Sequence, residues 1–462
     1  MYSFYCNLSL LFDDEKFHNL QLAEYFWPAS SIMGIHEVLD NYAFFYGKPE
    51  KHSVLASSVK FMVESVLLCC KYLLLKYRRA ANRKKIIGEV ASDTDVIIVS
   101  WLFKDNTDAF IKGVDERYWK NLKNDLSGLG YNAQFLLFPM FKLNEHELTR
   151  LLAAGIILIN SIGFFTLSRT FISLFHGIKK TAEILKITHR VSQLFFFLGS
   201  IMKPRLSRAI NIKGKMLNVF RKNNSVKKIY IPWESQPEQK AITWAAKANH
   251  IKVIGYIHSG MNDSLYAFIP KKIEVLWKPN QLLVHGSDFI EMLEYAGWDR
   301  QDISLIRSVR YPKIPTPQYF QGKLFLPYDV EKSLKYIDLA SDLISSNAIK
   351  VSEIKIHPAN EGNLRIRSRI KSIKKDDQAK DVVVCGFSAV ILEALESGVQ
   401  VLQMLDSPDS LEKIDSFCYS SIYQKRVNRN LVQLSMLDEN RGNLIDRLND
   451  RTILDSVGTR QV

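Results

Sequence analysis

Short, unbroken runs of apolar residues that alternate with segments of helical spacing constrain the fold of this chain more than any other feature. Residues 96–100 (VIIVS) form such a run, which is typical of a parallel strand buried on both faces. Equivalent runs recur at 133–138, 227–232, 251–257, 281–286, 303–309, 323–328, 352–358, 381–386 and 400–405. Helical spacing separates several of them, at 115–126, 237–249, 286–298, 329–346 and 389–398. This alternation predicts an α/β fold with two Rossmann-like, doubly wound domains that face a cleft.

Breaks in the alternation indicate how the 462 residues are organised. We expect a partly helical N-terminal extension at 1–92 and a first Rossmann-like domain at 93–275. A basic, apolar helical insertion at 151–228 interrupts this first domain. A second Rossmann-like domain is expected at 276–420, and a C-terminal helical appendage at 421–462.

The insertion carries almost all of the excess positive charge. The chain has a formal net charge of +14, and the segment 151–228 contains fourteen Lys or Arg against one acid, Glu183. Its first eighteen residues, 151–168, contain no charge, and further apolar runs (FISLF and LFFFLGSIM) follow. Apolar faces beside cations predict a hairpin that lies on an anionic membrane surface. A buried helical pair with a solvated basic flank and a membrane-spanning segment are the alternatives.

Composition narrows the partners and the compartment. The basic segment lacks a recognisable nucleic-acid-binding module, so nucleic acid is not expected as a partner. Five cysteines show no metal-ligand spacing, and an odd count argues against a secreted disulfide scaffold. The N-terminus, MYSFYCNLSLLFDDEK, does not read as a cleavable signal peptide. We therefore expect a cytoplasmic protein that is peripheral to the inner membrane.

Polar residues at the carboxyl ends of the expected strands are candidates for a binding site, because ligands of open parallel sheets bind at that edge. They are Glu234, His258, His285, His357 and Ser388. Glu234 and His258 follow neighbouring strands of the first domain, so either can act as the general base that deprotonates an acceptor hydroxyl. Other acids compete for this role, namely Glu238, Asp105, Asp108, Asp115 and Glu116.

The second domain offers groups suited to an anion. Pro358 stops the strand directly after His357, whose imidazole can donate to a phosphate oxygen. Gly386 allows a tight turn, and Ser388 can cap the next helix, whose free N–H groups and dipole favour a phosphate. Glu393 lies five residues further on and can reach a ribose hydroxyl.

Several enzyme classes lack their signatures here. The sequence contains no G-x-S-x-G elbow, no P-loop, no G-x-G-x-x-G after a strand, and no His or Cys cluster with metal spacing. Lipases, kinases, dehydrogenases and zinc enzymes are therefore disfavoured. No metal or other cofactor is expected.

Three stretches of the chain resemble bacterial surface-carbohydrate glycosyltransferases of the two-Rossmann (GT-B) type. They are residues 229–260, the strand–helix–strand at 281–311, and KIHP followed by VVVCGFSAVILEALESGVQVL. A His-Pro pair followed by a serine-bearing turn is similar to what bacterial sialyltransferases, ulosonic-acid transferases and glycerol-phosphate polymerases use on a nucleotide's phosphate. The resemblance covers roughly 93–150 and 229–405. It implies phosphate contacts by His357 and Ser388 and a ribose contact by Glu393.

The residues and the resemblance together predict a metal-independent glycosyltransferase of capsule or lipopolysaccharide biosynthesis. It would transfer a sugar from a nucleotide-activated donor, with a CMP-linked acidic sugar favoured, to a glycan or lipid-linked acceptor. Two alternatives stay open. One is a glycerol- or ribitol-phosphate transferase that uses a CDP-alditol on the same fold. The other is a catalytically inactive scaffold of a polysaccharide assembly complex.

Overall fold

The structure is a computed structural model, and it describes residues 86–159, 204–258, 278–407, 421–448 and 453–457 apart from single positions within them, together with Val63 and Leu67. Nearly all of the expected N-terminal extension lies outside the described residues. The central part of the expected insertion, 160–203, also lies outside them.

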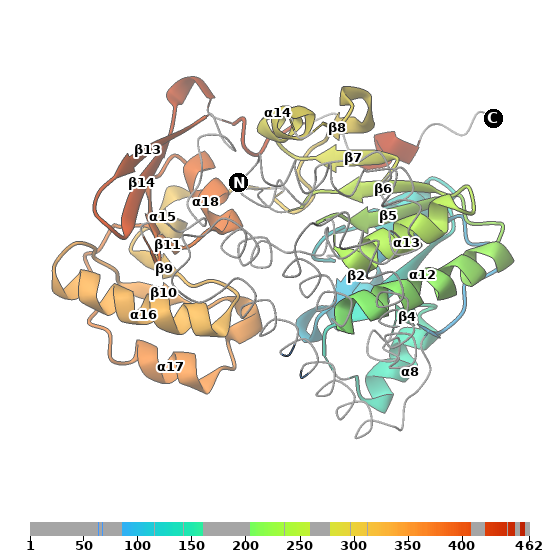
Figure 1. The fold of residues 1–462 in the computed structure, drawn as a ribbon, viewed down its shortest axis with the longest axis horizontal. Coiled ribbons are helices and arrows are strands. Elements are labelled where there is room, and N and C mark those ends of the chain that lie inside the picture. Colours follow the sequence, from blue (N-terminus) through green and yellow to red (C-terminus); the bar gives the residue numbers. More distant parts are fainter. Residues whose placement is uncertain are drawn as a thin grey trace, which may run out of the picture.

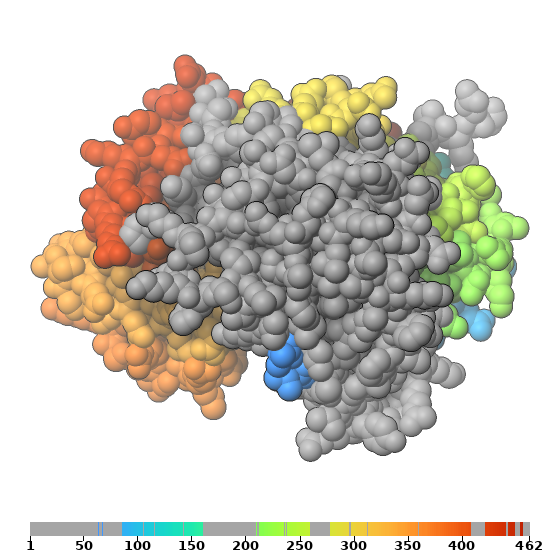
Figure 2. All heavy atoms as spheres, in the orientation of Figure 1, coloured from blue at the N-terminus to red at the C-terminus, as the bar shows by residue number. Residues whose placement is uncertain are grey.

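Two α/β units make up the described chain, and Figure 1 shows them side by side. Each is built on one twisted, mainly parallel sheet with helices on its faces. The predicted fold class, two Rossmann-like units, is confirmed. In Figure 2 the second unit, in orange and red, and the green helices of the first unit lie on opposite sides of the view.

Within the described ranges, the first sheet has eight strands in the order β1-β4-β3-β2-β5-β6-β7-β8. Neighbouring strands pair in parallel except for β1 and β4. The strands are β1 (Ile86–Ile87), β2 (Val96–Leu102), β3 (Ala133–Pro139), β4 (Ile157–Ile159), β5 (Lys228–Pro232), β6 (Lys252–Tyr256), β7 (Gln281–Val284) and β8 (Ile303–Leu305). The helices are α6 (Thr107–Lys112), α7 (Leu122–Gly128), α8 (Glu145–Ala153), α12 (Pro204–Lys222), α13 (Pro237–Lys247) and α14 (Ser287–Tyr295).

The run at β2 shows why an unbroken apolar sequence forms a central strand. Side chains alternate across a strand, so Ile97 and Val99 pack against one face of the sheet while Ile98 and Leu102 pack against the other. Helices α12, α13 and α14 cover the first face, whereas α6, α7 and α8 cover the second. Because both faces are buried, the strand is apolar at nearly every position, and its one polar residue, Ser100, is buried with a hydrogen-bond partner.

The second sheet has the order β10-β9-β11-β12-β14-β13 within the described residues, and β14 runs antiparallel to both of its neighbours, β12 and β13. Its strands are β9 (Lys323–Phe325), β10 (Glu353–Lys355), β11 (Val383–Cys385), β12 (Val401–Met404), β13 (Ile422–Arg426) and β14 (Leu431–Met436). Its helices are α15 (Pro317–Phe320), α16 (Val330–Ser345), α17 (Leu364–Ile370) and α18 (Ala389–Glu396). Helices α16 and α17 pack on one face, and α18 packs on the other.

The structure corrects the expected domain boundaries at two places. Strand β7 pairs in parallel with β6, and β8 pairs in parallel with β7, so both complete the first sheet, although 276 is where the second domain was expected to begin. The expected helical appendage at 421–462 contains β13 and β14, which form a hairpin on the edge of the second sheet. Only short helical turns occur in its other described residues, such as η8 (Ile453–Val457).

Both described ends of the basic insertion belong to the core, which corrects the expected lipid-facing hairpin there. Leu151, where the expected insertion begins, lies within α8, and β4 is fully buried in the first sheet. Helix α12 buries Ile212, Met216 and Phe220 against the sheet and α13. Its apolar stripe is therefore covered by protein, while Lys215, Arg221 and Lys222 remain exposed. Among the described residues, no helix is both long enough and apolar enough to cross a membrane.

A C-terminal segment, residues 443–446, ties the two units together, and we call it the strap. Glu396 of α18 accepts hydrogen bonds from the N–H groups of Leu444 and Ile445 at 2.9 and 2.8 Å. On the other side, the Asp446 N–H donates to the His285 carbonyl at 2.8 Å. Beyond the strap, Ile453 is buried in the core of the first unit. The chain therefore leaves the first unit after β8, forms the second, and returns.

Candidate functional site

Glu234 and His258 form a pair at the carboxyl edge of the first sheet. Strands β5 and β6 are adjacent, and each of the two residues follows the end of its strand by two positions. This register brings His258 Nε2 within 3.1 Å of Glu234 Oε1. The Glu234 side chain is 36% exposed, whereas His258 is only 4% exposed. The carboxylate is thus the member of the pair within reach of a ligand, and the imidazole orients it.

Gln239 and the ring of Tyr118 hold the pair in place. Gln239 accepts a hydrogen bond from the Glu234 N–H at 2.9 Å and donates one to the Pro232 carbonyl at 2.6 Å. The Tyr118 ring meets the His258 ring edge to face, with centroids 4.6 Å apart. His258 Nδ1 is buried and has no hydrogen-bond partner within the described part of the chain. The competing acid Glu238 lies in the first turn of α13.

The loop acids of the first unit have other roles where the structure describes them. Glu116 is 0% exposed and accepts hydrogen bonds from Ser100 Oγ and from the N–H groups of Tyr118 and Trp119. Burial raises the pKa of Glu116 to about 7. Through its hydrogen bonds to the backbone, Glu116 stabilises the loop that carries Tyr118. Asp108 forms an exposed ion pair with Arg150 at 2.7 Å. Asp115 and the side chain of Asp105 lie outside the described residues.

His285, another strand-end residue, is part of the core. Its side chain is completely buried, and its Nδ1 lies 2.9 Å from the Ile257 carbonyl oxygen. Burial lowers the pKa of His285 to about 4, so the ring is neutral at physiological pH. Its place behind His258 gives it a structural role.

His357 and Ser388 lie at the carboxyl edge of the second sheet, because they follow β10 and β11, the two neighbours of β9. His357 packs edge to face on the partly exposed ring of Tyr328, with centroids 5.3 Å apart. The His357 carbonyl accepts a hydrogen bond from the Asn360 N–H, which closes a short turn that begins at the exposed Pro358. Burial lowers the pKa of His357, and the charges of Arg117 and Arg310 lower it further.

The turn at Gly386 leads into α18 as the sequence predicts. Gly386 has a φ of +64°, a conformation that favours glycine. Its N–H donates to the Met404 carbonyl, and its own carbonyl accepts from Gln403 Nε2 at 3.0 Å. Ser388 is the N-cap residue, and its Oγ accepts a long hydrogen bond of 3.4 Å from the Val390 N–H. This end of α18 has N–H groups suited to an anion.

Two arginines of the first unit complete the site, and neither was among the residues selected from the sequence. Arg310 follows β8 by five positions, and its Nη1 donates to the His258 carbonyl at 3.2 Å. Its charge lowers the pKa of His357 and of Glu393 in α18, so it lies near candidate residues of the second unit as well. Arg117 packs over the Phe103 ring, 5.2 Å from its centroid. The sequence signal for Arg310 was its position shortly after the carboxyl end of β8, whereas α6 lies between β2 and Arg117.

Glu393 faces the first unit. Burial raises its pKa to about 7, whereas Arg310 and Tyr311, both from the loop after β8, act in the opposite direction. The two groups that lower the pKa of this carboxyl group therefore both belong to the first unit. The ribose contact that the resemblance implies for Glu393 stays a prediction.

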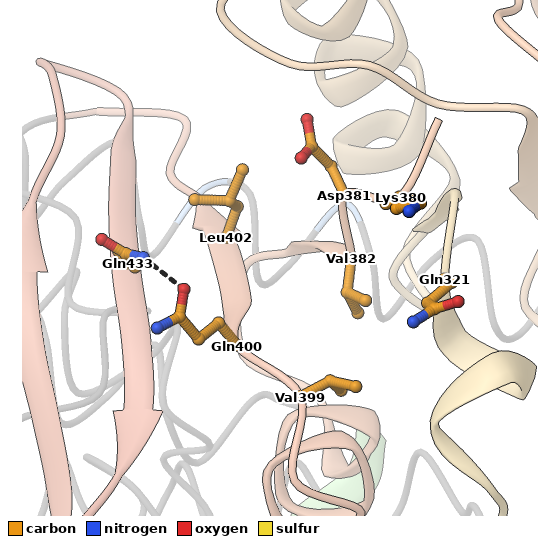
Figure 3. A pocket seen from close by; sticks show the side chains of 8 residues that line it. All are labelled: Gln321, Lys380, Asp381, Val382, Val399, Gln400, Leu402 and Gln433. Atoms are coloured by element: carbon orange, nitrogen blue, oxygen red, sulfur yellow. Dashed lines mark hydrogen bonds between the residues drawn. The ribbon is translucent and has the colours of Figure 1, made fainter. Parts of the chain in front are cut away.

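A separate cavity of about 300 Å³ lies at the opposite, amino-terminal edge of the second sheet. Figure 3 shows the side chains around it, which include Val382 before β11 and Gln400 before β12. A hydrogen bond of 2.7 Å from Gln433 Nε2 to Gln400 Oε1 lies at its margin. None of the candidate site residues lines this cavity. Within the described ranges, no cluster of three or more His, Cys, Asp or Glu is arranged to hold a metal ion.

Comparison with known proteins gives only distant likenesses. No protein-family model and no curated protein matches the sequence. Among solved structures, the chain is similar to a UDP-GlcNAc 2-epimerase from Neisseria meningitidis bound to UDP-GlcNAc. That match has 12% identity and a TM-score of 0.37, over 71% of this chain and 86% of that chain. It is also similar to the lipopolysaccharide outer core galactosyltransferase WaaB in its apo form, with 12% identity and a TM-score of 0.29, over 68% and 80%. Likenesses this weak do not bear on activity.

Proposed function

We propose that this chain is a metal-independent glycosyltransferase that uses a nucleotide-activated sugar, and that it acts in the assembly of a bacterial surface polysaccharide. The observation that supports this most directly is the Glu234–His258 pair, held at 3.1 Å on the first unit. Arg310 connects this pair to His357 of the second unit through a hydrogen bond on one side and its charge on the other. These contacts support a base and an anion-binding group that act in one site.

In the proposed reaction, Glu234 accepts the proton of an acceptor hydroxyl as the oxygen attacks the anomeric carbon of the donor sugar. The bond from that carbon to the phosphate oxygen breaks, and the nucleotide leaves with the bonding electron pair. His357 and the N–H groups at the start of α18 stabilise the charge that develops on the phosphate. His258 keeps the Glu234 carboxylate oriented by its hydrogen bond.

For the donor, we propose a CMP-linked acidic sugar, and for the acceptor a glycan or lipid-linked glycan at the cytoplasmic face of the inner membrane. The His357-Pro358 pair and the Ser388 turn support a nucleotide phosphate. Transfer of a phosphoryl-alditol would use the same phosphate contacts, so the product distinguishes that alternative. An inactive scaffold would bind no nucleotide in this site.

Replacing His357 with alanine is expected to weaken nucleotide binding about 10- to 100-fold, because a hydrogen bond to a charged group contributes about 1.5–3 kcal/mol. The measurement is thermal stabilisation by CMP, CDP, UDP and GDP, since a ligand that binds only the folded state raises the melting temperature. Stabilisation by one nucleotide that His357→Ala removes supports the proposal.

The matched control is His146→Ala, because His146 is an exposed residue of α8. It should leave the stabilisation unchanged. If no nucleotide stabilises the wild-type protein, or if His357→Ala responds like the wild type, the proposed donor site is wrong.

We also propose that the protein contacts anionic lipid through charge on α12 rather than through its covered apolar stripe. Lys215, Arg221 and Lys222 are exposed on this helix. Each basic residue near an anionic surface contributes about 1 kcal/mol. Changing all three to glutamate should therefore reduce binding to phosphatidylglycerol-containing vesicles at least 100-fold, as measured by co-sedimentation. Unchanged sedimentation would exclude this surface, and phosphatidylcholine vesicles provide the control.

A further inference from the structure

Arg310 is a cation that folding partly removes from water and that forms no ion pair within 4 Å with a described carboxylate. Its guanidinium donates one hydrogen bond, to the His258 carbonyl, and it packs 5.4 Å from the centroid of the Tyr311 ring. Within the part of the chain that the structure describes, no carboxylate oxygen lies within ion-pair distance of it. A guanidinium carries five N–H donors and stays protonated. Burial of such a group is costly unless an anion compensates it.

Among the described residues, the charges near Arg310 are a second arginine and carboxyl groups that do not reach ion-pair distance. Arg117 packs on the Phe103 ring, and its charge, like that of Arg310, lowers the pKa of His357. It therefore adds positive charge to the same region. Among the described residues, Glu393 is the acid whose charge acts on Arg310, and burial raises the pKa of Glu393 to about 7. Two arginines therefore lie in one region, and neither makes an ion pair there with a described carboxylate.

We propose that Arg310 and Arg117 form a subsite for an oxyanion, a phosphate or a carboxylate group of the ligand, at the junction of the two units. This rests on the proposed function and deepens it, because the oxyanion would belong to the nucleotide-activated donor. The planar fork of a guanidinium matches both kinds of oxyanion with two parallel hydrogen bonds. The stacking of Arg310 on Tyr311 and its bond to His258 hold that fork beside the Glu234–His258 pair.

Because the two arginines belong to the first unit, the subsite would help to orient a ligand that the second unit binds. The nucleotide phosphate would lie at His357 and Ser388 of the second unit, whereas Arg310 and Arg117 belong to loops of the first. An oxyanion held by these arginines connects the ligand to both units at once. A donor that carries a second phosphate or an acidic sugar has such a group, and a neutral sugar on CMP has none.

The test measures the binding of inorganic pyrophosphate, CMP, CDP and a non-transferable fluorinated CMP-sialic acid by titration calorimetry at low ionic strength. Wild-type protein is compared with Arg310→Gln and Arg117→Gln. Arg307→Gln is the matched control, because Arg307 is an exposed residue of the same loop. Each of the two variants should weaken pyrophosphate binding about 10- to 100-fold, and the control should not change it. Thermal unfolding establishes that the variants are folded.

The nucleotide arms identify the source of the oxyanion. If CDP binds more tightly than CMP and Arg310→Gln removes that difference, the subsite takes a second phosphate. If the CMP-sialic acid analogue binds more tightly than CMP and Arg310→Gln removes that difference, the subsite takes a sugar carboxylate. The Arg117 side chain packs on the Phe103 ring and makes no side-chain hydrogen bond with another described residue. Arg117→Gln therefore keeps the test interpretable if Arg310→Gln does not fold.

The subsite is excluded if folded variants bind pyrophosphate, CDP and the analogue like the wild type, or if the wild type binds none of these probes. Failure of the proposed function is a different result. In that case pyrophosphate binding depends on Arg310 whereas no nucleotide binding depends on His357.

Discussion

Replacing Glu234 with glutamine is expected to reduce sugar transfer about 100- to 10,000-fold, which is the usual contribution of a positioned general base. Glutamine keeps the size of the side chain, and its amide oxygen can still accept a hydrogen bond from His258 Nε2 in place of Glu234 Oε1. Only the ability to accept a proton is lost. The affinity for the nucleotide, which the second unit binds in this proposal, should stay within about twofold of the wild-type value.

Single-turnover release of the nucleotide, measured with saturating donor and acceptor, tests this expectation. Until the acceptor is known, the surface glycan of a deletion strain that carries the variant is the readout. Glu294→Gln is a suitable control because Glu294 is an exposed residue of α14. A loss of transfer in Glu238→Gln combined with a fully active Glu234→Gln would assign the base to the first turn of α13 instead.

Replacing Gly286 with alanine is expected to destabilise the junction of the two units strongly. A Cβ atom at this position would lie 2.0 Å from the carbonyl oxygen of Leu444 in the strap. This neighbour is backbone, and the Glu396 carboxylate and the His285 carbonyl hold the strap from both sides. The overlap cannot be relieved by turning a side chain. We expect a loss of about 1–3 kcal/mol or more in the free energy of unfolding.

Thermal unfolding together with limited proteolysis measures this effect, since a displaced strap exposes the chain between the units to proteases. Gly362→Ala is the matched control, because no atom lies within 4 Å of the added Cβ there. It should leave both readouts unchanged. A Gly286→Ala protein with wild-type stability and cleavage would show that the strap can move aside without cost.

The sequence predicts the central strands well because their apolar runs are set by burial on both faces. The runs at 96–100 and 133–138 become β2 and β3 with nearly the predicted bounds. It does not predict which sheet a strand joins. The apolar runs of β7 and β8 would suit either sheet, and the pairing of β7 with β6 and of β8 with β7 depends on contacts between distant residues.

The hairpin at the end of the second sheet was missed for a different reason. Strand β13 has only one buried position out of five, because it lies at the sheet edge. An edge strand of this kind contains polar residues such as Gln424 and Lys425, so its sequence lacks the apolar signal used for the other strands. The expected helix at 421–462 was wrong where β13 and β14 are described.

The candidate site could be predicted in part. The rule that ligands bind at the carboxyl ends of parallel strands selects Glu234 and His258, and the structure brings them into contact. The same rule selects His285, which is buried in the core. It does not reach Arg310, because the importance of that residue depends on how the loop after β8 lies between the units. Whether these residues act as proposed is what the variants above test.

The return of the chain through the strap has a consequence for dividing the protein into fragments. A first unit cut after the loop that follows β8 would lack η8, and the site that Ile453 fills in its core would be open. A second unit expressed alone would carry that missing segment at its own end. Two such fragments are therefore expected to associate when they are produced together, as in fragment complementation. A circular permutation that opens the chain in the β13–β14 turn would keep the same contacts within a single polypeptide.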